Sequence, residues 1–165
     1  MPLNLQNKKE IIAKINKIAS TALSVIIADS RGVKSNNITR LRQLSREVGV
    51  KINIVRNTLL NLAVQGTDFE CLKNTFNGPT LIAYSLEHPG SAARLLKEFS
   101  KKNTSFKITG GAFEKKHLSI SQINILADIP TYNEAISLFM SLIKEVAAGK
   151  LVRTLAAISK KKEIN

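Results

Sequence analysis

The stretch KINIVRNTLLNLAV, residues 51–64, contains the passage from a strand to a helix on which the predicted fold rests. Apolar residues in KINIV are spaced as in a β-strand, and the leucine-rich pattern from Leu59 onward is typical of a helix. Arg56, Asn57 and Thr58 stand between them. Asn57 or Thr58 can cap the helix, but a cap does not explain a cation at the positive end of a helix dipole. We therefore expect Arg56 and the helix N-terminus to share a bound anion.

Segments of these two kinds alternate along the first 130 residues. Apolar residues at helical spacing predict helices, and short β-branched runs predict strands. The expected helices cover residues 4–19, 36–48, 57–65, 69–76, 89–102 and 119–127, and the expected strands cover residues 23–28, 51–55, 80–85 and 106–113. Strands separated by helices indicate an α/β fold, which we expect to be a mixed sheet of about four strands covered by helices.

Two finer expectations concern the ends and faces of these elements. The helix at 36–48 should end at Gly49, because glycine is the usual residue just after a helix. Its spacing directs four apolar residues towards the core: Ile38, Leu41, Leu44 and Val48. The glycine pair Gly110-Gly111 lies inside a predicted strand, which indicates a β-bulge or a close backbone approach.

The pattern changes beyond Pro130. Residues 132–160 contain no proline and are predicted to form one long helix, with Thr131 and Glu134 as a capping box and a possible bend at Ala147-Ala148-Gly149. Apolar residues cover more than half of its circumference: Ile136, Phe139, Met140, Ile143, Val146, Ala147, Leu151, Val152, Leu155 and Ile158. Such a helix must be buried, either on its own domain or on a partner. Since the first 130 residues already supply a closed core, we favour a partner and divide the chain into residues 1–130 and 131–165.

The charge of the chain is strongly positive. A net charge of +13 indicates a polyanionic partner, either a nucleic acid or, less often, an anionic membrane surface. The first 60 residues hold 11 basic and 3 acidic residues, whereas residues 61–130 hold 8 and 6. Aromatic residues make up only 5% of the chain, so base stacking is an unfavourable mode of binding. We expect a nucleic acid to be held mainly through its phosphates by the first third of the chain.

Two loops in this basic segment follow predicted strands. If the two strands are parallel neighbours, the loops DSRG (29–32) and RNT (56–58) lie at one edge of the sheet, where open α/β sheets bind ligands. Arg31 and Arg56 can each form a forked contact with a phosphate, and Gly32 lets the backbone approach closely. The predicted anion-binding residues are Arg31, Gly32, Arg56, Asn57 and Thr58, with Lys34 and Lys51 added from their charge alone.

The sequence does not predict an enzyme. The glycine pair lacks the Lys-Ser/Thr of a phosphate-binding loop, and neither His88 nor His117 has the i, i+4 partner of a helical metal site. The single Cys71 has apolar neighbours and is expected to be a buried structural thiol. We therefore expect no cofactor and no metal. Neither a signal peptide nor an apolar run of membrane-spanning length is recognisable, so the expected location is the cytoplasm, away from any membrane.

Stretches distributed along the whole chain resemble a known protein family. The resemblance lies in these stretches: ALSVIIADSRGV (22–33), VRNTLL (55–60), FECLK (69–73), NGPTLIAYSLEHPG (77–90), PTYNEAI (130–136) and AGKLVRTLAAI (148–158). They are similar to the bacterial large-subunit ribosomal protein L-ten family, whose members lie at the base of the lateral stalk. The resemblance implies an α/β domain that binds the GTPase-associated region of large-subunit rRNA, beside protein L-eleven. It also implies a C-terminal helix that carries dimers of the acidic stalk protein L-seven/L-twelve, with room for two. Those dimers recruit translational GTPases.

The same resemblance assigns roles to residues. The rRNA contacts fall on Arg31, Gly32, Arg56, Asn57 and Thr58, and the stalk dimers fall on the ten apolar positions between Ile136 and Ile158. Family members also repress their own operon by binding the mRNA leader. Two rival hypotheses are kept: an extraribosomal RNA-binding regulator whose C-terminal helix self-associates, and a small enzyme that uses Cys71.

Overall fold

The computed structural model describes residues 4–164, apart from the side chains of Asn74, Ala148 and residues 161–164. The chain forms two compact units, Met1–Ile129 and Pro130–Asn165. The first unit contains α1 (Leu5–Thr21), β1 (Ser24–Asp29), α2 (Ser35–Glu47), β2 (Val50–Ile54), α3 (Asn57–Val64), the 3₁₀ helix η1 (Glu70–Thr75), β3 (Thr80–Ser85), α4 (Ser91–Lys102), β4 (Lys107–Phe113), β5 (Lys116–Leu118) and α5 (Ile120–Asp128). The second contains α6 (Tyr132–Lys144), the π-helical turn η2 (Glu145–Gly149) and α7 (Lys150–Ile164). The α/β fold class is thereby confirmed.

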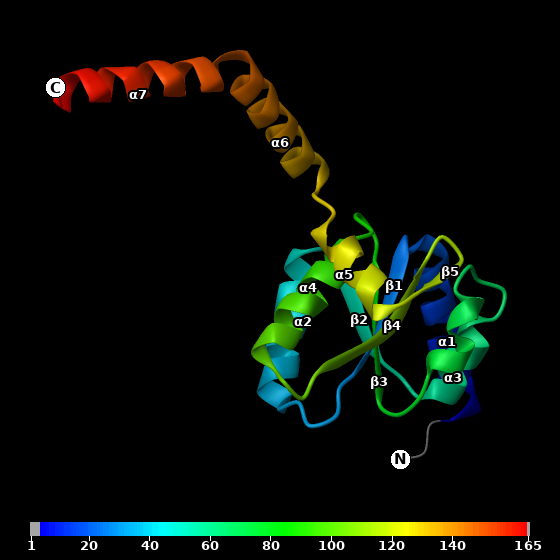
Figure 1. Ribbon diagram of the computed structural model, residues 1–165. Coiled ribbons are helices and arrows are strands. Elements are labelled where there is room, and N and C mark those ends of the chain that lie inside the picture. Colours follow the sequence, from blue (N-terminus) through cyan, green and yellow to red (C-terminus); the bar gives the residue numbers. More distant parts are fainter. Residues whose placement is uncertain (1–3, 165) are drawn as a thin grey trace. The chain divides into compact units, whose positions relative to one another are not determined.

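The sheet corrects the expected pairing. Its strand order is β2-β3-β1-β4-β5, and all four pairings are antiparallel, so the expectation of a mixed sheet was wrong. β3 enters between β1 and β2, which are therefore not neighbours (Figure 1). Because each of them runs antiparallel to β3, they are still parallel to each other. Their C-terminal ends lie at one edge of the sheet, as the predicted site requires.

The short strand β5 was not predicted. It follows β4 through a two-residue turn in which Glu114 and Lys115 have φ angles of 49° and 64°. Hairpin turns with two positive φ angles usually contain Asn or Gly, so Glu-Lys gives no turn signal in the sequence. Lys115 Nζ lies 3.2 Å from Asp68 Oδ1 in the loop before η1, and this ion pair joins the turn to its neighbour.

Both faces of the sheet are covered by helices. Ile26 and Ala28 of β1 point into a core under α2, α4 and α5, whereas Val25 and Ile27 point into a core under α1, α3 and η1. This alternation along one strand places apolar side chains on each side of the sheet, and Figure 1 shows helices over both faces. The strand β1 is therefore the centre of the first unit.

The apolar face predicted for α2 was partly wrong. Leu41 is fully buried, but Leu44 and Val48 are 41% and 44% exposed. They line a hollow between α2 and α4, so the two helices do not close over these side chains. Gly49, with a φ of 69°, follows this turn as expected of a helix-ending glycine.

β4 contains a bulge directly before its glycine pair. Ile27 of β1 pairs with Gly110 and Ala28 pairs with Ile108, so Thr109 has no partner in the ladder. A Cβ atom at Gly111 would lie 2.8 Å from the carbonyl oxygen of Val25. Gly111 thus permits the close approach of β4 to β1.

The second unit is helical from Tyr132 to Ile164. The predicted capping box is present, since the Thr131 backbone N–H donates to Glu134 Oε2 at 2.9 Å. A single uninterrupted α-helix was wrong, because η2 separates α6 from α7 near the small-residue cluster (Figure 1). Arg153 Nη2 donates to Glu145 Oε2 at 2.8 Å across this turn, and a Cβ at Gly149 would lie 2.5 Å from that oxygen. Gly149 leaves the space that this ion pair uses.

Candidate nucleic-acid interface

The DSRG loop follows β1 at the lower edge of the sheet in Figure 1. Asp29 Oδ1 accepts a hydrogen bond from the Arg31 backbone N–H at 3.0 Å, which forms a tight turn, and the Arg31 side chain is exposed. Gly32 has a φ of 73°, a conformation that costs glycine little. Its φ turns the chain towards Lys34, whose backbone forms the N-cap of α2. The loop thus presents two exposed cations beside a helix N-terminus.

The RNT loop follows β2 at the same edge, with a different cap from the one expected. The N-cap of α3 is Arg56, and it has no side-chain cap, so the prediction that Asn57 or Thr58 caps the helix was wrong. Asn57 Nδ2 instead donates to the carbonyl oxygens of Phe76 and Gly78, at 3.1 and 2.9 Å. The exposed side chains of Arg56 and Thr58 remain directed away from the core.

The start of β3 lies between the two loops. An open hollow at this edge is lined by residues of the RNT loop and of the lead-in to β3: Ile54, Val55, Arg56, Asn57, Thr58, Gly78, Pro79 and Thr80. The Ser30 backbone N–H donates to the Pro79 carbonyl at 3.3 Å, so the DSRG loop is joined to the same segment. Sequence reasoning did not assign these β3 residues to the site, although NGPT belongs to the stretch that resembles the family.

The structure separates Lys51 from this edge and brings Lys14 close to it. Lys51 pairs with Tyr84 near the end of β3, so it lies at the opposite end of β2 from Arg56 and is not part of the edge. Lys14 of α1, which the sequence did not single out, lines a hollow together with Arg56 and Leu59. Its only sequence signal is its place on the basic face of α1. The structure therefore brings Arg31, Lys34 and Arg56 to one edge, with Lys14 beside it.

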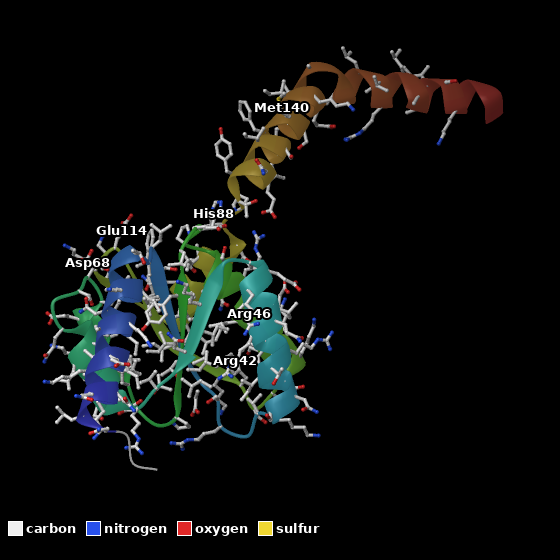
Figure 2. The ribbon with its side chains drawn as sticks, turned by 180° about the vertical axis from the view of Figure 1, so that it is seen from behind. Arg42, Arg46, Asp68, His88, Glu114 and Met140 are labelled. Atoms are coloured by element: carbon white, nitrogen blue, oxygen red, sulfur yellow. The ribbon has the colours of Figure 1, made fainter. Side chains whose placement is uncertain are left out.

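Carboxylates gather at the other end of the sheet. Asp68 and Glu114 lie together at the upper end of the first unit in Figure 2, beyond the start of β1. Arg46 belongs to the last turn of α2, also away from the edge that carries Arg56. A polyanion would therefore approach the lower edge with little repulsion from these two carboxylates.

Cys71 corrects another expectation. Its side chain is exposed rather than buried, while partial desolvation raises the pKa of its thiol. A raised pKa lowers the thiolate fraction at neutral pH, which is the reverse of what a nucleophile needs. Among the described residues, no group of three or more His, Cys, Asp or Glu side chains could hold a metal ion.

We predict that Cys71 reacts slowly with iodoacetamide at pH 7.5. Its rate should fall below that of a cysteine in an unfolded peptide, and its pH–rate profile should be displaced to higher pH, because the folded thiol ionises less readily. Mass spectrometry of the alkylated native protein, with the urea-unfolded protein as control, measures both. Faster alkylation in the native state would contradict this account of Cys71.

The second unit exposes a continuous set of apolar side chains. Within the described part of α6 no residue is buried, and Phe139 and Met140 are 63% and 62% exposed. The other predicted positions are exposed as well: Ile136, Ile143, Val146, Ala147, Leu151, Val152, Leu155 and Ile158. Exposed apolar surface of this extent is typical of interaction sites. Within the described residues, no helix is both long and apolar enough to span a membrane.

Comparison with known proteins decides the family. A family model described as "Ribosomal protein L10" matches residues 3–101, and one described as "Ribosomal protein uL10 C-terminal region" matches residues 129–164. The chain belongs to the uL10 family. "Large ribosomal subunit protein uL10" of Cronobacter sakazakii is 58% identical over 163 residues, which cover 99% of each chain. Those of Erwinia tasmaniensis and Klebsiella pneumoniae are both 56% identical over 163 residues, covering 99% of this chain and 98% and 99% of their own.

Membership of the uL10 family confirms the resemblance seen in the sequence. The family is a structural protein of the large ribosomal subunit and not an enzyme, so the prediction that the chain is not an enzyme is confirmed. The chain is accordingly a ribosome-bound protein of the cytoplasm that takes part in translation. RNA binding is consistent with this membership and with the basic edge described above.

Proposed function

We propose that the protein anchors the lateral stalk of the large ribosomal subunit. The first unit binds the GTPase-associated region of large-subunit rRNA, beside protein L-eleven. The second unit carries two dimers of the acidic stalk protein L-seven/L-twelve, which recruit translational GTPases. The observation that carries this proposal is the division of the chain into a compact unit with a basic edge and a helical unit with unburied apolar side chains.

The basic edge supports the RNA-binding half of the proposal. Arg31, Lys34 and Arg56 are exposed, and two of them stand directly at helix N-termini, where backbone N–H groups also favour phosphate oxygens. A cation at a helix N-terminus destabilises the helix slightly unless an anion joins it. A phosphate bound by Arg56 and the first N–H groups of α3 removes that repulsion.

Replacing Arg56 by alanine tests this half. We expect Arg56→Ala to weaken binding of an rRNA transcript of the GTPase-associated region and to make the slope of log K against log salt shallower by about one unit, as for one lost phosphate contact. Filter-binding titrations at a series of KCl concentrations, from about 50 to about 300 mM, measure this slope. Arg46→Ala is the matched control, since it removes the same charge away from the edge. Equal slopes for both variants would mean that Arg56 contributes only its positive charge and makes no specific phosphate contact.

The exposed helical face supports the second half. Apolar residues are exposed along both α6 and α7, and basic residues accompany them in α7, where Lys150 and Arg153 lie among the apolar positions, so acidic partner dimers would meet an apolar face on both helices and an attractive charge on α7. Charge complementarity of this kind speeds encounter more than it sets affinity. The apolar side chains supply most of the affinity once water is excluded.

A second candidate function uses the same basic edge away from the ribosome. The protein would bind the leader of its own mRNA and repress its operon, and in the stronger form of this alternative its C-terminal helix would self-associate. The observation that favours it is that the edge exposes the cations Arg31, Lys34 and Arg56, and cations that bind phosphates do not distinguish ribosomal from messenger RNA. A reporter gene fused to the mRNA leader is co-expressed with the wild-type protein or with Arg56→Ala. Its expression level shows whether the protein represses the leader and whether Arg56 is needed for that repression.

A further inference from the structure

The lead-in to β3 connects the two basic loops. The Ser30 backbone N–H donates to the Pro79 carbonyl at 3.3 Å, and Asn57 Nδ2 donates to the Gly78 carbonyl at 2.9 Å. Two consecutive residues of this segment therefore hold the two loops: Gly78 holds the RNT loop, and Pro79 holds the DSRG loop. The spacing between Arg31 and Arg56 is set by these contacts rather than by direct pairing of β1 with β2.

Gly78 has a second contact, with the Arg31 guanidinium. A Cβ atom at Gly78 would lie 2.6 Å from Arg31 Nη2 and 3.3 Å from Cζ, so the guanidinium occupies the space that a side chain would fill. Arg31 Nε lies 3.7 Å from Asp29 Oδ2. The guanidinium is thus held between the Asp29 carboxylate and the bare Cα of Gly78.

We infer that Gly78 is a positioning residue of the RNA-binding edge. Its missing side chain leaves the space in which the Arg31 guanidinium lies, and its carbonyl holds Asn57 beside Arg56. This inference deepens the proposed function and rests on it. A forked contact with a phosphate depends on the direction of the guanidinium plane, so a displaced Arg31 loses the contact even though its charge remains.

Substitution of Gly78 should act on RNA binding and spare the core. The atoms that an alanine side chain would meet belong to the end of the Arg31 side chain, which is exposed and can move away. The remaining cost is backbone strain, because Gly78 has a φ of 81°. Gly66 offers a matched control: its φ is 76°, and a Cβ there would have nothing within 4 Å. Gly66→Ala therefore reproduces the strain without the contact.

The experiment measures the affinity of the full-length chain for an rRNA transcript of the GTPase-associated region over a range of salt. We expect Gly78→Ala to bind about tenfold more weakly than Gly66→Ala, with a slope shallower by about one unit, and Arg31→Ala to show the same two changes. The double variant Arg31→Ala/Gly78→Ala should bind no more weakly than Arg31→Ala alone, because one contact cannot be lost twice. Thermal melting of both glycine variants checks that their folds are equally stable.

Three results would overturn the inference, and the first two are distinguishable from the third. If Gly78→Ala binds like Gly66→Ala while Arg31→Ala is weakened, Gly78 does not position Arg31, and the proposed RNA-binding edge stands. Additive losses in the double variant lead to the same conclusion. If Arg31→Ala and Arg56→Ala both bind as the wild type does, the edge itself is not the RNA site, and the inference fails with the proposed function.

Discussion

Replacing Ile143 by aspartate should prevent an acidic stalk protein dimer from docking on α6 while rRNA binding stays unchanged. Ile143 is 49% exposed in the isolated chain and lies in the middle of the proposed docking face. Burying a carboxylate without a partner in an apolar interface costs several kcal/mol, which corresponds to a loss of affinity of roughly 100-fold or more. Repulsion from the acidic partner adds to this loss. Isothermal titration with the acidic protein measures it.

The matched control is Ser141→Asp, which adds the same charge to the polar face of the same helix. Ser141 is exposed, and its hydroxyl donates to the Leu138 carbonyl at 2.7 Å. We expect this variant to load dimers almost as the wild type does, so that charge alone cannot explain the loss in Ile143→Asp. If Ile143→Asp lowers rRNA affinity as well, the two units do not have separate tasks.

Gly111→Ala should destabilise the first unit by about 1–3 kcal/mol and lower its melting temperature by about 5–15 °C. The added Cβ would lie 2.8 Å from the Val25 carbonyl oxygen of β1, and this oxygen belongs to the backbone of the central strand. It would also lie 3.5 Å from Ile123 Cδ1 of α5. Neither β1 nor α5 can move without disturbing the core on its face of the sheet. Circular dichroism during heating measures the change.

Gly110→Ala is the control for Gly111→Ala. The adjacent glycine would place its Cβ 3.2 Å from His117 Nε2 and 3.3 Å from Thr75 Cγ2, and both are side-chain atoms near the edge of the sheet that can shift slightly. We expect a smaller loss of stability than at Gly111. Equal losses at both positions would mean that β-propensity, and not the approach of β4 to β1, explains the glycine pair.

The fold was largely predictable because its local signals agree. Short β-branched runs such as 23–28 form strands, and the capping box at Thr131 begins a helix as expected. Strand order was not predictable, because the insertion of β3 between β1 and β2 depends on contacts between residues far apart in the sequence. β5 was missed because its positive-φ turn is made of Glu114 and Lys115, which carry no turn signal.

The candidate site was predictable only in part. Charge and position after strands indicated Arg31 and Arg56, and the structure brings both to one edge. The structure does not bring Lys51 to this edge, because charge does not say which end of a strand a residue occupies. The role we infer for Gly78 could not be read from the sequence, since it depends on where the Arg31 side chain lies in space. Whether any of these residues contacts rRNA stays a prediction for the titrations above.

The central claim is that one chain anchors two acidic dimers through its second unit. Its most direct test is the native mass of the complex formed when the full chain is co-expressed with the acidic stalk protein of the same genome, with a variant ending at Ile129 as control. Our account predicts a mass equal to one copy of this chain plus four acidic chains, with no acidic chain retained by the shortened variant. A homodimer of this chain without acidic chains would contradict it and favour the self-associating regulator.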